Sequence, residues 1–107
     1  MPKPELDEKQ SAEAARVTAM IDRLAAQGSA GGHLEVLPEL RRTCSDRLVL
    51  GDVLGDVLHR VVVGAQAETI SSWPVLDLLR AAGADEERAA AKAAWLRSQA
   101  EDSWSAA

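Results

Sequence analysis

The stretch from Leu50 to Leu58 reads the four-residue unit Leu-Gly-Asp-Val twice in succession and closes on a further leucine. A repeat of four is close to the 3.6-residue turn of an α-helix, whereas a β-strand alternates every two residues. Wound as a helix, the leucines and valines share one broad face, and the polar residues lie opposite: Asp52, Asp56, His59 and Arg60. The repeat therefore predicts an amphipathic helix whose polar face meets water.

Two glycines, Gly51 and Gly55, fall at the edge of the apolar face and are four residues apart. A glycine inside a helix costs roughly 1 kcal/mol relative to alanine. Close approach of a second helix backbone is the usual compensation, so the pair predicts a tight contact between helices. The sequence does not show whether the second helix belongs to the same chain or to another subunit. We expect Gly55→Leu to break assembly if the contact joins two subunits.

Apolar periodicity and capping signals predict further helices on both sides of the repeat. Asp7 to Gln10 offers an acidic helix start, and the apolar residues that follow keep a helical spacing until Gly28. The Gly28–Gly32 segment is expected to be a connector. A short second helix is expected around Leu34–Leu40, with Pro38 as its first residue or as a kink.

Three more signals complete the pattern. Ser45 or Asp46 can cap the helix that carries the repeat, which should run to about Gly64. Ser71 and Ser72, before Trp73-Pro74, predict the start of the next helix, and Gly83 predicts its end. Acidic residues at 85–87 then predict the start of an alanine-rich last helix.

Together these segments predict an all-α fold, a compact bundle of four to five helices in one domain spanning residues 1–107. The helix at about 46–64 should be central, with the first and last helices packed across its leucine and valine face. Residues 1–5 and 101–107 are expected to be frayed tails. A chain of 107 residues is about one domain by size.

Composition excludes several classes of function. The net charge is −5, and the chain has no asparagine, which argues against a partner made of nucleic acid or an anionic membrane surface. Acidic and basic residues interrupt the longest apolar run, so no transmembrane span is expected. A single cysteine and a polar N-terminus predict a cytoplasmic protein. Abundant alanine, with more arginine than lysine, is typical of a GC-rich bacterial genome.

The sequence offers few residues for chemistry. Asp52, Asp56 and His59 share one helical face and have the spacing of metal ligands in helical bundles, but a solvated face is the ordinary interpretation of such a trio. Nothing near Cys44 marks it as a nucleophile, although His33 or His59 could serve as its base. We therefore expect no cofactor, and the sequence favours a non-enzymatic function over catalysis.

Trp104 stands in the polar C-terminal segment, where it either folds back onto the bundle or anchors another protein. We predict a non-enzymatic helical protein–protein interaction module, either a homodimer or an accessory subunit that binds another helical protein. Its candidate interface comprises Leu50, Gly51, Leu54, Gly55, Leu58 and Trp104. The alternative is a ligand- or metal-binding bundle, or an enzyme, that uses the face of Asp52, Asp56 and His59.

Overall fold

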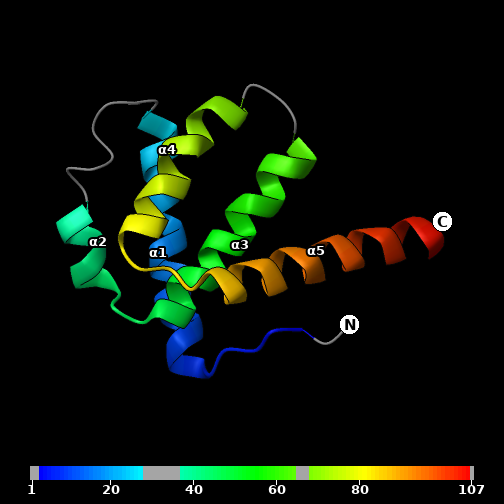
Figure 1. The fold of residues 1–107 in the computed structure, drawn as a ribbon, viewed down its shortest axis with the longest axis horizontal. Helices are drawn as coiled ribbons and strands as arrows, with labels where there is room; N and C mark the ends of the chain where they lie inside the picture. The colour runs from blue at the N-terminus through cyan, green and yellow to red at the C-terminus, as the bar shows by residue number, and fades with distance from the viewer. Residues whose placement is uncertain (1–2, 28–36, 65–67, 107) are drawn as a thin grey trace.

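In a computed structural model, five helices follow one another in the part of the chain that the structure describes (Figure 1). The structure describes the backbone of residues 3–27, 37–64 and 68–106, and the side chains of residues 3–23, 37–60 and 75–100. The helices are α1 (Glu8–Gln27), α2 (Leu37–Thr43), α3 (Arg47–Gly64), α4 (Glu68–Ala81) and α5 (Glu86–Ala106). The described backbone contains no strand, which confirms the all-α prediction.

Side chains cap the N-termini of α1, α3 and α5 where the sequence predicts helix starts. Asp7 and Gln10 form a reciprocal capping box at α1: the Gln10 amide donates to Asp7 Oδ1 at 2.7 Å, and the Asp7 amide donates to Gln10 Oε1 at 3.1 Å. Asp46, rather than Ser45, caps α3, because its Oδ1 accepts the Leu48 amide at 2.9 Å. Asp85 caps α5 by accepting the Arg88 amide at 2.9 Å.

Gly83 ends α4, as expected, and turns the chain sharply toward α5. Its φ of 100° lies in the left-handed region, which glycine adopts without steric cost. The Gly83 amide donates to the Arg80 carbonyl at 3.0 Å, and the Ala84 amide donates to the Leu79 carbonyl at 3.1 Å. This pair of bonds is a Schellman motif, which satisfies two carbonyls that the helix end leaves free.

The second helix, α2, is described from Leu37 onward, and the earlier part of the expected helix lies outside the described residues. The boundaries of two other helices differ from the expectation. α4 begins at Glu68 instead of Ser71 or Ser72, so Pro74 lies inside the helix; local propensity is a weak signal that packing on α3 overrides. α5 continues through 101–106, where a tail was expected.

α3 is the central helix and is buried on every side over two turns. It packs against α1, α4 and α5, and each residue from Val49 to Gly55 is buried. The core around it draws on α1 through Val17 and Ile21, on α2 through Leu40, and on α4, which contributes four apolar residues. None of the described helices is long and apolar enough to cross a bilayer.

Candidate functional site

The two glycines of the repeat lie against α5 of the same chain. A Cβ atom built on Gly51 would stand 2.5 Å from the Asp85 carbonyl oxygen, and one built on Gly55 would stand 2.6 Å from the Ala89 carbonyl oxygen. Real Cβ contacts are not that short, so only glycine lets the two backbones approach this closely. The predicted helix contact therefore exists, and it is intramolecular.

This contact places α5 differently from the expectation. α5 packs on the glycine and aspartate side of α3, and not on its leucine and valine face. The candidate interface residues Leu50 and Leu54 are fully buried in the chain's own core, and Leu58 is partly buried against it. Trp104 belongs to α5 by its backbone, and its side chain lies outside the described residues.

Asp52 is the polar residue that this packing buries. Its side chain is only 5% exposed, whereas the sequence predicted a carboxylate in water. Arg88 donates to Asp52 Oδ1 through Nε at 3.2 Å and through Nη2 at 3.0 Å, and Lys92 Nζ donates to Oδ2 at 3.2 Å. Both carboxylate oxygens are thus satisfied by two cations from α5, as a buried charge requires.

Asp56 and His59, the other members of the polar trio, do not join Asp52 in a metal site. Both are partly buried. Burial raises the pKa of Asp56, against the opposing pull of Lys92, and the neighbouring Asp52 raises it further. Among the described residues, no group of three or more His, Cys, Asp or Glu is placed to hold a metal ion. Asp52 already has its two partners on α5, so the geometry gives the metal interpretation no support.

Cys44 is buried and is not activated. Its thiol donates to Glu13 Oε2 at 3.4 Å, and its sulfur also lies 3.7 Å from the Asp46 carbonyl oxygen. Burial is the main reason that the pKa of Cys44 is raised, and the Glu13 carboxylate raises it further. A raised pKa leaves less thiolate, so the environment disfavours nucleophilic chemistry. His33, one of its candidate bases, lies outside the described residues.

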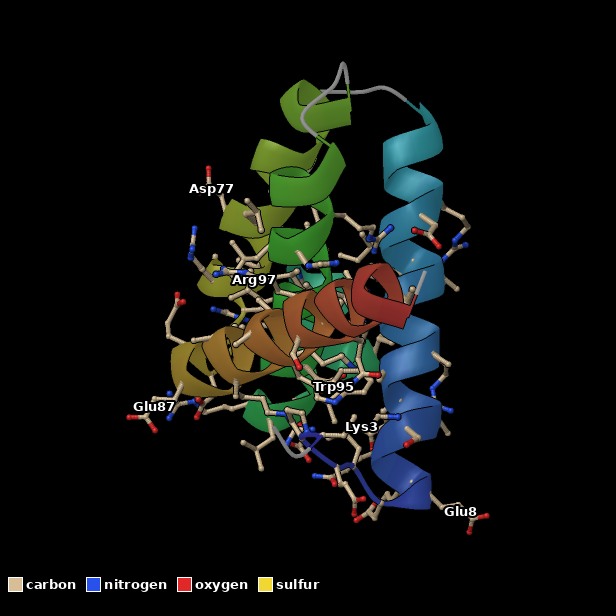
Figure 2. All side chains as sticks on the ribbon, turned by 90° about the vertical axis from the view of Figure 1, so that its right-hand side faces the viewer. Lys3, Glu8, Asp77, Glu87, Trp95 and Arg97 are labelled. Atoms are coloured by element: carbon tan, nitrogen blue, oxygen red, sulfur yellow. The ribbon has the colours of Figure 1, made fainter. Side chains whose placement is uncertain are left out.

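The N-terminal residues 3–7, which we call the strap, run beside α5 before α1 begins (Figure 1). Arg88 Nη2 donates to the Glu5 carbonyl at 3.1 Å, so the arginine that pairs with Asp52 also holds the strap. Lys3 Nζ lies 5.3 Å from the centroid of the Trp95 ring, and Lys92 Nζ lies 5.7 Å from the same centroid. Figure 2 shows Lys3 and Trp95 together between α5 and α1.

A cleft of about 420 Å³ lies between the strap, α1, α3 and α5. Its polar lining includes Lys3, Ser11, Asp52 and Lys92, and its apolar lining includes Leu6 and Ala14. The cleft is the candidate functional site, because charged side chains from the strap, α3 and α5 meet in it.

Sequence reasoning missed Lys3, Arg88, Lys92 and Trp95 as members of this site. One signal was present: Arg88 and Lys92 are four residues apart on one helix, as Asp52 and Asp56 are on another. Matching spacing with opposite charge favours pairing of the two helices. Nothing in the sequence indicates that the strap returns to α5.

Comparison with protein families, with curated proteins and with solved structures finds no match to this chain.

Proposed function

We propose that the protein is a non-enzymatic helical interaction module, a homodimer or an accessory subunit of a larger protein, and that it meets its partner through the C-terminal half of α5. The proposal rests on one observation, that α5 is long and extends beyond the rest of the bundle. This helix has 21 residues, about 31 Å at 1.5 Å per residue, and its C-terminal half projects past the other four helices (Figure 1).

One row of small and apolar residues along α5 runs off the edge of the bundle. Ala89 is fully buried against α3, Ala93 and Leu96 are partly buried, and Ala100 is exposed. Trp104 follows Ala100 by four residues, so the helical repeat places it on the same row. The N-terminal half of α5 packs on α3. A partner helix that packs along the projecting C-terminal half would cover the rest of the same row.

This proposal replaces the contact surface expected from the repeat. Gly51, Gly55, Leu50 and Leu54 serve the chain's own core, so they are not available to a second protein while the fold is intact. Gly55→Leu should therefore unfold or distort the bundle, and its effect does not report on assembly.

Two exposed alanines on opposite sides of α5 give a matched test. Ala100 lies on the proposed row, and Ala91 is nine residues away, which is half a turn round the helix. The homodimer form of the proposal predicts that the wild type and Ala91→Glu have twice the monomer mass by light scattering, whereas Ala100→Glu is monomeric with unchanged helical content. A dimeric Ala100→Glu would contradict the proposed surface.

A monomeric wild type would exclude the homodimer and leave the accessory subunit. That form predicts that a photo-crosslinking residue at position 100, in protein produced in its own host, captures one discrete partner. The same residue at position 91 should capture none. Equal labelling from the two positions would contradict the proposal.

A further inference from the structure

Lys3 and Lys92 line the cleft together with Asp52 and Glu5, and Arg88 reaches Asp52 from outside this lining. Arg88 and Lys92 both pair with Asp52, so two cations share one carboxylate whose oxygens are already occupied. Lys3 adds a third cation at the cleft, and it forms no ion pair with any carboxylate that the structure describes. The cluster of Lys3, Asp52, Arg88 and Lys92 therefore carries three positive charges and one negative charge, and three of its members, Lys3, Asp52 and Lys92, line the cleft.

The acidic residues nearby do not cancel this surplus by direct contact. Glu5 also lines the cleft, but it is exposed, and its hydrogen bond to Arg88 comes from the backbone carbonyl. Asp56 acts on Lys92 only at longer range, because no ion pair joins them within 4.0 Å. An exposed carboxylate in water compensates a nearby cation weakly.

Two of the cations lie near the Trp95 ring. The ammonium groups of Lys3 and Lys92 both lie within 6 Å of its ring centroid, at 5.3 and 5.7 Å. Two like charges gathered at one ring repel each other, and an anion placed beside both ammonium groups would remove that repulsion. Each ammonium carries three N–H donors, and Lys92 uses one of them on Asp52, so donors remain for a ligand.

We propose that this cleft binds a small organic oxyanion, a carboxylate or a phosphate ester, whose charged group is held between Lys3 and Lys92. The Ser11 hydroxyl offers a further donor, and Leu6 and Ala14 offer an apolar wall for the rest of the molecule. The volume of about 420 Å³ lies within the range of small-molecule sites. Because Lys3 belongs to the strap, the ligand would also tie the strap to α5.

The test is a titration of the ¹⁵N-labelled full chain with sodium benzoate and, separately, with phenyl phosphate, at constant ionic strength. We expect saturable chemical-shift changes at the amides of Leu6, Ser11 and Lys92 and at the Trp95 indole. Saturation by benzoate alone assigns a carboxylate ligand, and saturation by phenyl phosphate alone assigns a phosphate ester. Shifts that stay linear for both probes, or that spread over the whole surface, would overturn the proposal.

Lys3→Gln is the decisive variant, because Lys3 lies on the strap and outside the buried pairs with Asp52. Losing one charged donor should weaken binding by about tenfold or more. Lys9→Gln is the matched control: Lys9 is exposed on α1, two residues from Ser11, and its removal should leave the dissociation constant unchanged. Equal weakening in the two variants would mean that the probes respond to overall charge, which would overturn the site.

Discussion

At the scale of single residues, Gly51 and Gly55 set the distance between α3 and α5. We predict that Gly55→Ala lowers the free energy of unfolding by about 1–2 kcal/mol, because the new methyl group meets the Ala89 backbone and Lys92 Cβ, each at 2.6 Å. Helix propensity alone would change the stability in the opposite direction, by about 1 kcal/mol. Urea unfolding followed by circular dichroism shows whether Gly55→Ala lowers or raises the free energy of unfolding. A stabilised variant would contradict the close contact.

Asp52 is the second residue on which the α3–α5 contact depends. We predict that Asp52→Ala costs about 3 kcal/mol or more, because it leaves Arg88 and Lys92 without a carboxylate partner, with side chains only 13% and 12% exposed. The triple variant Asp52→Leu/Arg88→Met/Lys92→Met should regain most of that loss, since apolar groups of similar volume often replace a buried ion network without cost. Denaturant unfolding of both variants checks this, and a triple variant as unstable as Asp52→Ala would refute it.

Asp56 gives the contact a dependence on pH. Burial raises its pKa above the usual 3.8, so the folded state binds the Asp56 proton more tightly than the unfolded state does. The favourable contribution of the protonated form is fully present below pH 3.8 and is lost as the pH rises through the folded-state pKa. We predict that Asp56→Asn is more stable than the wild type at pH 7 and that this advantage shrinks as the pH falls toward 4. Thermal unfolding across that range tests the trend; a constant difference would contradict it.

At the scale of the helices, local signals predicted most of what the structure shows. The capping residues Asp7, Asp46 and Asp85 and the terminator Gly83 act through atoms a few residues away, so a sequence can display them. The start of α4 and the end of α5 escaped prediction, because Pro74 and the polar residues after Ala100 suggest breaks locally. Helix boundaries are the part of a fold that local propensity determines least.

The end of α4 is itself open to test. No atom lies within 4 Å of the position a Cβ would take on Gly83, so a substitution there meets backbone strain and no steric clash. We predict that Gly83→Ala costs about 1 kcal/mol and that Gly83→Asn costs less, because asparagine tolerates the left-handed conformation better. Equal costs in chemical denaturation would indicate that the side chain, and not the positive φ, sets the penalty.

At the scale of the whole molecule, the sequence could not show which helix covers which face of α3. The repeat correctly indicated a close helix contact, but Asp52 looked solvated because its partners are 36 and 40 residues away. When a helix is covered on all sides, its polar residues are buried, and each of them must then find a hydrogen-bond or ion-pair partner on a neighbouring helix. Periodicity within one segment does not contain that information. The cleft was unpredictable for the same reason, since the strap, α1, α3 and α5 meet there only after folding.

The strap packs on α5, and deleting it tests whether the five helices need these contacts to stay folded. We predict that deleting residues 1–6 leaves α1–α5 folded, because Asp7 still caps α1 and the described core contains no residue before Val17. The deletion removes the Glu5 carbonyl from Arg88 and Lys3 from Trp95, so the melting temperature should fall by about 5 °C, the equivalent of about 1 kcal/mol.

Deletion of residues 1–2 alone is the matched control and should leave the melting temperature unchanged, because Lys3 and Glu5 remain. The longer deletion should also abolish the saturable response to benzoate or phenyl phosphate, since one wall of the cleft is gone. If the longer deletion melted at the wild-type temperature, the contacts of the strap would contribute nothing to stability. If it lost its helical signal at 25 °C, the bundle would depend on residues 1–6 more than its core composition implies.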